Sequence, residues 1–286
     1  ENVFNLIESA RKSGLRISAD MYTYPAAATV LDATMPSWVQ EGGHDEWVKQ
    51  LQIPSVRERV SQEMLDENSV WENFFMQAGP KGILLTGFRN SKLKKYIGMT
   101  LQEVSEIRGT SPQITAMDLV IEDNSRIDAV FFLMSEENVT KQIKKPWMSF
   151  GSDAGAIANE GVFLEKSLHP RAYGNFARVI GKYVRDEQVI TMKEAIRRLT
   201  SLPAKNIGIQ DRGSIQLNNY ADIIIFDPEE VNDKATFKKP HQYAVGMKHV
   251  FVNGKQVLKD GEHTGAMPGQ VVRGPGWRGW NDQFNQ

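Results

Sequence analysis

Apolar positions along the chain change their spacing several times, and each change predicts a different element. Residues 3–10 place apolar side chains at helical spacing, and Gly14 follows, which predicts a first helix that ends near residue 12 or 13. Residues 15–22 favour a strand, and the small residues that follow favour a loop at its carboxyl end. Loops at strand ends commonly carry function, so this one is a candidate region.

The pattern of residue types along the chain changes between about residues 31 and 109. Tryptophans, glycine pairs and charged helical stretches surround a single strand candidate at residues 82–88, which predicts an inserted subdomain. From Ser111 onward, a helix, a short apolar strand at 129–134, a helix after Ser135 and a strand at 147–150 alternate. This alternation is typical of an α/β fold with helices outside a sheet.

Helical spacing ends near Gly208, and the pattern becomes β-like from residue 211. Residues 213–217, 221–227 and 248–262 predict strands, and Asn253-Gly254 between two apolar runs predicts a two-residue hairpin. The residues from 263 to 286 contain several glycines and prolines with Trp277 and Trp280, so we expect an extended tail.

The amino-acid composition excludes several classes of protein and of binding partner. The 286 residues are 41% apolar and 24% charged, a normal globular balance. Lysine plus arginine number 34 and aspartate plus glutamate 35, so no global charge favours nucleic acid. The apolar runs are far shorter than the ~20 residues of a membrane span. Cysteine is absent, which excludes disulfides and thiolate chemistry and leaves cytoplasm and periplasm equally open.

Asp153 is the strongest candidate for chemistry. It lies in Gly151-Ser152-Asp153-Ala154-Gly155, directly after an apolar strand, where small neighbours let a ligand approach a carboxylate. A plain turn in which Asp153 caps the next helix is the alternative interpretation.

Three further side chains are candidates for binding. Arg171, after His169-Pro170, could hold a carboxylate through two hydrogen bonds, although a surface ion pair is the alternative. Tyr22 and Tyr24 flank the end of the first predicted strand, where a phenol could hydrogen-bond a ligand or a ring could simply pack.

Other site motifs are missing from the sequence. The five histidines show no HxH or HExxH spacing, Ser152 is not in a GxSxG elbow, and no phosphate-binding glycine motif follows a strand. The residues alone therefore predict neither a complete metal site nor a nucleophilic triad.

Seven segments taken in order carry a family resemblance. DMYTYPAAAT, FFLMSEENV, PWMSFGSDAG, HPRAYGNFARVIGKYV, RRLTSLPAKNIGI, DRGSIQLNNYADIIIFD and HVFVNGKQVLKDGEHTGAMPG together resemble the D-aminoacylases, the N-acyl-D-amino-acid deacylases of the amidohydrolase superfamily. The resemblance covers nearly the whole chain and is weakest between residues 31 and 109.

The resemblance implies an α/β fold, a metal-dependent (β/α)8 barrel joined to a small β-sandwich. Residues 1–210 would be the C-terminal part of the barrel, with the insertion at about 31–109, and residues 211–262 a segment of the sandwich. A complete barrel takes roughly 250 residues, so the rest would be supplied by an N-terminal half of the same protein or by an oligomer partner.

The resemblance also assigns roles. Asp153 would be the general base on a zinc-bound water and a weak second-metal ligand, whereas the other zinc ligands lie outside this chain. Arg171 would hold the substrate's α-carboxylate, with Tyr22 and His169 beside it, and Met134 would line the side-chain pocket. The family usually has a Gly-Ser pair after its Tyr-Pro-Tyr stretch, whereas this chain has Thr23 and Ala26 to Ala28 there, which removes one hydroxyl contact to the substrate.

These roles imply a zinc-dependent hydrolase that acts on linear amides. It would cleave an N-acyl-D-amino acid into a D-amino acid and a carboxylate, with this fragment inactive alone. Two alternatives are a non-catalytic fragment that binds small carboxylates and a related amidohydrolase that acts on cyclic amides.

Overall fold

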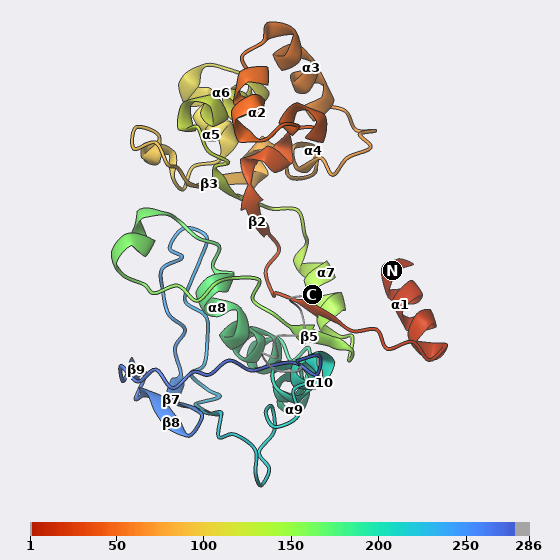
Figure 1. Cartoon of the computed structure of the whole chain (residues 1–286), viewed down its shortest axis with the longest axis vertical. Helices are drawn as coiled ribbons and strands as arrows, with labels where there is room; N and C mark the ends of the chain where they lie inside the picture. The colour runs from red at the N-terminus through yellow and green to blue at the C-terminus, as the bar shows by residue number, and fades with distance from the viewer. Residues whose placement is uncertain (1, 278–286) are drawn as a thin grey trace, which may run out of the picture.

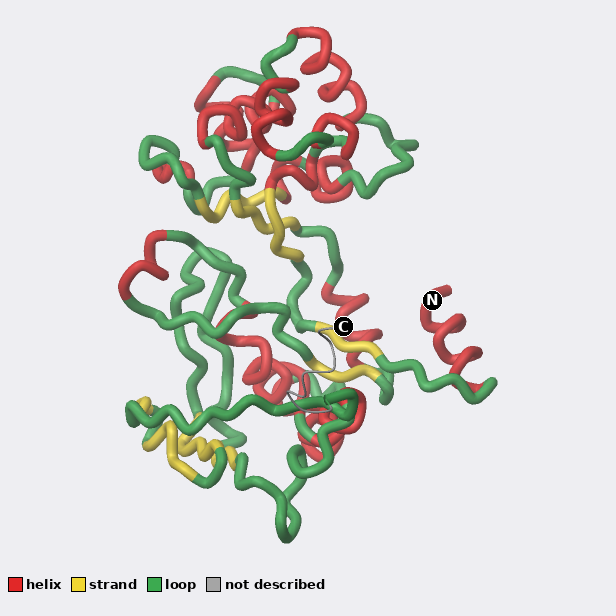
Figure 2. Tube along the Cα trace, viewed as in Figure 1, coloured by secondary structure: helices red, strands yellow, loops and turns green. Residues whose placement is uncertain are grey.

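The structure is a computed structural model of the chain and describes residues 2–277. Figure 1 shows an upper body, built from residues 27–133, joined by two chain segments to a lower body that contains the remaining elements. Strands occur in both bodies, in three separate sheets (Figure 2).

The lower body is organised around two parallel strands. β1 (Ala19–Met21) and β5 (Met148–Phe150) pair in register, with Ala19 opposite Met148 and Met21 opposite Phe150. Because the strands are parallel, their carboxyl ends meet at the same edge, where the sequence placed its candidates. Neither outer edge of this pair has a strand partner among residues 2–277.

Helices cover the strand pair. They are α7 (Glu136–Ile143), α8 (Arg171–Arg178) with its π-helical continuation η6 (Val179–Asp186), α9 (Met192–Leu199) and α10 (Ser201–Ile207). The short turn η5 (Gly161–Glu165) lies in the connection between β5 and α8 and has no buried residues. Met21, Ile143, Phe150, Val179 and Tyr183 lie in their shared core. The predicted caps Ser135 and Thr191 are confirmed, since each accepts a hydrogen bond from the third helical residue.

α1 (Asn2–Lys12) ends before Gly14, as predicted, and none of its residues is buried. Only Ala19–Met21 of the strand expected at residues 15–22 is regular, because β5 offers a partner over three residues alone. The backbone before Ala19 has no neighbouring strand with which to pair in the described structure.

The upper body has an antiparallel sheet, with β4 (Asp128–Phe131) between β2 (Ala27–Val30) and β3 (Ile83–Gly87). Its helices are η1 (Leu31–Thr34), η2 (Ser37–Gln40), α2 (His44–Gln50), α3 (Pro54–Met64), α4 (Phe74–Ala78), η3 (Pro80–Gly82), η4 (Lys94–Tyr96), α5 (Leu101–Arg108) and α6 (Pro112–Asp123). One apolar core of fully buried residues, including Leu31, Leu101 and Met117, fills it.

This upper body is larger than the insertion expected at about 31–109. β2 precedes that range, and α6 and β4 follow it, yet β4 pairs with both other strands and α6 supplies the same core. We expected α6 and β4 to belong with β5, because strand and helix alternate there. Pairing with β2 and β3 instead places β4 in a different sheet.

The C-terminal part forms an antiparallel sheet in the order β6 (Ile223–Phe226), β7 (Met247–Val252), β8 (Lys255–Lys259) and β9 (Glu262–His263). The predicted hairpin is confirmed, since Asn253 and Gly254 both have positive φ. The strand expected at 213–217 is wrong, because Ile215 and Leu217 are exposed with no strand beside them in the described structure. Trp280 of the expected tail lies outside the described residues.

No helix within residues 2–277 has both the length and the apolar character that crossing a membrane requires.

Candidate active site

The candidate residues lie where β1 and β5 end. Tyr22 follows β1 directly, and Asp153 follows β5 after Gly151 and Ser152. Asp153 has a φ of 49°, a left-handed conformation that is uncommon for a residue with a side chain. Strain of this kind persists where the surroundings impose it and is concentrated at functional sites. The Asp153 side chain is 72% exposed and faces open space.

Arg171 brings the two strand ends together. It is the first residue of α8, and its Nη2 lies 2.9 Å from Asp153 Oδ2. Its guanidinium also lies 4.5 Å from the centre of the Tyr22 ring, within range of a cation–π interaction. The Arg171 side chain is only 7% exposed, so a buried cation points toward an exposed carboxylate. The positive charge of Arg171 is therefore paired with the Asp153 carboxylate at this edge of the strand pair.

Tyr22 is half-buried between Arg171 and His169. Burial raises the pKa of its phenol, although the nearby Arg171 cation partly opposes that shift. The phenol therefore stays protonated at neutral pH and can donate a hydrogen bond to an anion.

His169 is fully occupied by protein contacts. Its Nε2 lies 2.9 Å from the Ala26 carbonyl oxygen, and its Nδ1 accepts the backbone N–H of Arg171 at 3.0 Å. These partners require the neutral tautomer with hydrogen on Nε2. Burial lowers the pKa of this imidazole to about 3. His169 thus fixes the loop before Arg171, and neither ring nitrogen is free for a ligand.

Met134 lies next to the loop that follows β1. Its backbone N–H donates to the Pro25 carbonyl at 3.2 Å, and its side chain is partly exposed. The segment that leaves β4 therefore passes beside the loop that leaves β1.

Asn175 is a site residue that the sequence did not reveal. It is buried on α8, where its Oδ1 accepts the Thr23 N–H at 2.8 Å and its Nδ2 donates to the Gly151 carbonyl at 2.9 Å. One side chain therefore fixes the residue after Tyr22 and the residue two before Asp153. Its role depends on segments more than 150 positions apart, so no local pattern could have shown it.

The described residues do not fit a metal ion by themselves. Among residues 2–277, no group of three His, Cys, Asp or Glu side chains could hold one. Asp20 of β1 lies beside Gly151, so this edge carries two carboxylates and no free imidazole.

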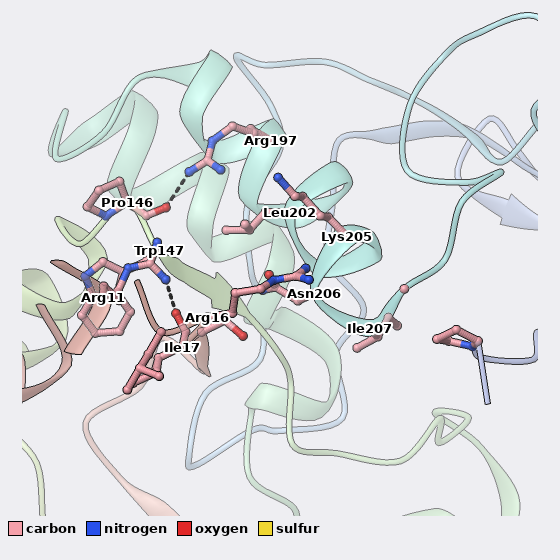
Figure 3. A pocket seen from close by; sticks show the side chains of 14 residues that line it. Arg11, Arg16, Ile17, Pro146, Trp147, Arg197, Leu202, Lys205, Asn206 and Ile207 are labelled. Carbon is pink, nitrogen blue, oxygen red and sulfur yellow. Dashed lines mark hydrogen bonds between the residues drawn. The ribbon is translucent and has the colours of Figure 1, made fainter. Parts of the chain in front are cut away.

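A separate cavity of about 850 Å³ lies at the opposite end of the strand pair (Figure 3). Ile17 and Ser18, before β1, and Pro146 and Trp147, before β5, line it. The Arg197 guanidinium at its wall donates to the Pro146 carbonyl at 2.6 Å. In parallel α/β folds, ligands bind at the carboxyl ends of strands, so we assign no catalytic role to this cavity.

Comparison with known proteins identifies the family. The sequence model of the Amidohydrolase family matches residues 116–258, half of the chain, and includes Met134, Asp153 and Arg171. The chain belongs to the amidohydrolase family.

Three proteins similar to this amidohydrolase are deacylases of D-amino acids. The N-acyl-D-aspartate deacylase of Alcaligenes xylosoxydans xylosoxydans is 38% identical over 145 residues, which are 50% of this chain and 28% of that protein. A D-aminoacylase structure matches with a TM-score of 0.67 at 28% identity, over 93% of this chain and 44% of that one. An N-acyl-D-glutamate deacylase structure from Bordetella bronchiseptica, complexed with zinc and a phosphonate inhibitor, matches with a TM-score of 0.64 at 26% identity, over 91% and 44%.

The resemblance predicted from the sequence is therefore confirmed at the level of the family. This amidohydrolase shares the mixed α/β fold of the D-aminoacylases. It spans less than half the length of each of these relatives.

Proposed function

We propose that this chain is the C-terminal portion of a zinc-dependent hydrolase that cleaves N-acyl-D-amino acids. The products are a D-amino acid and a carboxylate. The observation that carries the proposal is the pairing of Asp153 with Arg171 at the carboxyl ends of two parallel strands. Three of the matched relatives are named as deacylases of D-amino acids, and these names support the substrate class, whereas a fourth, shorter match is to a dihydroorotase.

In the proposal, Arg171 binds the substrate's α-carboxylate. The buried guanidinium offers two-point recognition of a carboxylate, and the Tyr22 phenol donates a further hydrogen bond beside it. Met134, on the neighbouring segment, lines the pocket for the side chain, and His169 holds the loop before Arg171.

Asp153 is the general base. Water adds to the acyl carbon while Asp153 takes its proton, and the carbon–nitrogen bond then breaks as that proton passes to the leaving amine. Arg171 Nη2 lies 2.9 Å from Asp153 Oδ2, so a substrate whose carboxylate is bound by this guanidinium would lie close to the base. The contact between Asp153 and the buried Arg171 guanidinium supports an assignment beyond a simple turn.

We include zinc in the proposal because the structure of the N-acyl-D-glutamate deacylase relative contains zinc. Because the described residues supply no three-ligand group, we propose that the zinc ligands belong to residues outside the described chain, with Asp153 as a weak ligand at most.

The edges of the strand pair, unpaired within residues 2–277, support the proposal that another polypeptide segment completes the fold. In the proposal, β1 and β5 are neighbouring strands of a (β/α)8 barrel, and β6 to β9 are part of a small β-sandwich. Both outer edges of the strand pair lack partners in the described structure. An N-terminal half of the same protein, or an oligomer partner, would pair with them.

The test uses the protein that carries both halves, with zinc, and N-acetyl-D-glutamate and N-acetyl-D-aspartate as substrates. We expect Asp153→Asn to lower kcat by on the order of 10²- to 10⁴-fold with little change in the unfolding temperature. Asp186→Asn is the matched control, because Asp186 is also an exposed aspartate paired with an arginine. Full activity in Asp153→Asn would rule out the general-base assignment.

The two alternatives give different results in the same experiment. Binding of N-acetyl-D-amino acids without turnover by the wild-type protein would favour a carboxylate-binding module. Arg171→Ala should selectively impair substrates that carry a carboxylate. Equal loss on carboxylate-free cyclic amides would contradict the role given to Arg171.

A further inference from the structure

A segment of the C-terminal unit reaches back to the candidate site. Residues 231–237, here called the strap, follow β6 and lie along the helix formed by α8 and η6. At its start, Val231 is fully buried among Ala177 and Ile180. The strap therefore connects the C-terminal sheet with the helix that carries Arg171.

Two glycines make room for the strap. Gly174 and Gly181 are seven positions apart on this continuous helix, so they lie on nearly the same face. A Cβ at Gly174 would lie 2.7 Å from Asp233 Cβ, and a Cβ at Gly181 would lie 2.7 Å from the Val231 carbonyl oxygen. Glycine inside a helix costs stability, and here the close approach of the strap accounts for it.

The strap holds the strand-end loop, defined as residues 22–26, through Asp233. The Tyr24 phenol donates to Asp233 Oδ2 at 3.0 Å, and Arg178 Nη1 donates to the same oxygen at 3.1 Å. Asp233 and Arg178 are mostly buried, and Tyr24 is 3% exposed. Charge-assisted hydrogen bonds of this kind are the stronger ones.

Arg178 extends the connection to the backbone of the loop. Its Nε donates to the Thr23 carbonyl at 3.0 Å, while Asn175 accepts the Thr23 N–H. Both backbone groups of the residue next to Tyr22 are therefore bound by side chains of the same helix. The conformation of Thr23 determines where Tyr22 points.

Phe237, at the far end of the strap, packs on the other side of the loop. Its ring centre lies 5.1 Å from that of His169, 6.2 Å from that of Tyr24 and 4.7 Å from that of Phe132. The strap thus contacts the loop that carries Tyr22, the loop that precedes Arg171 and the segment that leads to Met134.

We propose that the strap is a positioning element for the candidate site, with Asp233 as the residue that fixes the strand-end loop so that Tyr22 faces Arg171. This inference rests on the proposed function for its kinetic consequence, and on the contacts above for its structural one. Asp233 accepts hydrogen bonds from Tyr24 and Arg178 and would act through them, so it is a positioning residue.

The test compares Asp233→Asn and Tyr24→Phe with Asp260→Asn in the protein that carries both halves. Asp260 is the control, because it is an exposed aspartate of the same C-terminal unit. Kinetics are measured on an N-acetyl-D-amino acid and on its carboxamide analogue, which lacks the carboxylate. Amide hydrogen exchange of residues 22–30 is measured on the same proteins.

We expect Asp233→Asn to raise KM for the carboxylate substrate by on the order of tenfold, with a smaller change in kcat. The carboxamide should be affected much less, so the preference for the carboxylate falls. A role in stability alone would lower the folded fraction and reduce both activities equally. Exchange of the loop should become faster, whereas exchange of α9 should stay the same.

Tyr24→Phe removes one hydrogen bond and leaves the Asp233–Arg178 pair intact, so it tests the same connection if Asp233→Asn does not fold. Unchanged loop exchange together with unchanged substrate preference would overturn the inference. If the wild-type protein hydrolyses none of the substrates, the proposed function fails, and the exchange result still decides whether the strap holds the loop.

Discussion

His169 shows how a single residue connects stability to the site. Its pKa is lowered from 6.5 to about 3 by burial, so the folded chain keeps it neutral while the unfolded chain takes up a proton below about pH 6.5. The free energy of unfolding should therefore fall as the pH falls from about 6.5 toward 3, by at most about 1.4 kcal/mol per pH unit from this group.

Urea unfolding at about pH 8 and about pH 5 measures this slope. His169→Gln is the informative variant, because its amide can still donate to the Ala26 carbonyl but does not titrate. The variant should show a shallower pH dependence than the wild type. An identical slope in both proteins would show that His169 is not buried in its neutral form.

Asn175 gives a second prediction at this scale. Asn175→Ala removes the partners of the Thr23 N–H and the Gly151 carbonyl, which lie one residue after Tyr22 and two residues before Asp153. A buried polar group left without a partner costs about 1–3 kcal/mol, so unfolding should become easier by about that amount or more. Thr140→Ala, a helical control outside these contacts, should change the midpoint of urea unfolding far less.

Sequence reasoning located Asp153, Arg171 and Tyr22, because each is next to a recognisable strand or helix end. It did not find Asn175, Arg178 or Asp233. Their contacts join segments between 24 and 209 positions apart, and nothing near them in the sequence marks those contacts. It also assigned His169 to the substrate, whereas the structure uses both of its nitrogens internally.

At the scale of elements, the helix that begins at Arg171 contains a glycine whose replacement by alanine should lower the stability of the protein. Alanine normally stabilises a helix relative to glycine by roughly 0.5–1 kcal/mol. Gly174→Ala should instead destabilise the protein, because the new methyl group would meet Tyr24 and Asp233. Thermal unfolding measures the difference. Gly82→Ala is the matched control, since its nearest neighbour would lie at 3.4 Å, and a rise in unfolding temperature for Gly174→Ala would contradict the close packing of the strap.

Elements with strong local signals were predicted well, and those that depend on partners were not. The hairpin at Asn253-Gly254 and the caps at Ser135 and Thr191 are local, and the structure confirms them. The assignment of β4 failed for a different reason. A short apolar strand does not encode which sheet it joins, and pairing with β2 and β3 decided it.

At the scale of the whole molecule, the strand pair predicts the behaviour of the isolated chain, because neither outer edge of the pair has a strand partner among residues 2–277. Unpaired parallel strands and exposed apolar side chains such as Val3 and Leu6 of α1 favour association. The purified 286-residue chain should elute in size-exclusion chromatography with light scattering as an oligomer or aggregate. Coexpression with the N-terminal half should shift it to a defined species, whereas a stable monomer of the chain alone would contradict the account.

The most direct test of the central claim measures zinc content and turnover together. Zinc per chain is determined by elemental analysis, and hydrolysis of N-acetyl-D-glutamate is assayed on the same samples, for the 286-residue chain alone and for the protein that carries both halves. We expect zinc and hydrolysis only in the protein with both halves. Tightly bound zinc with turnover in the isolated chain would contradict this expectation, because the metal ligands would then have to come from this chain.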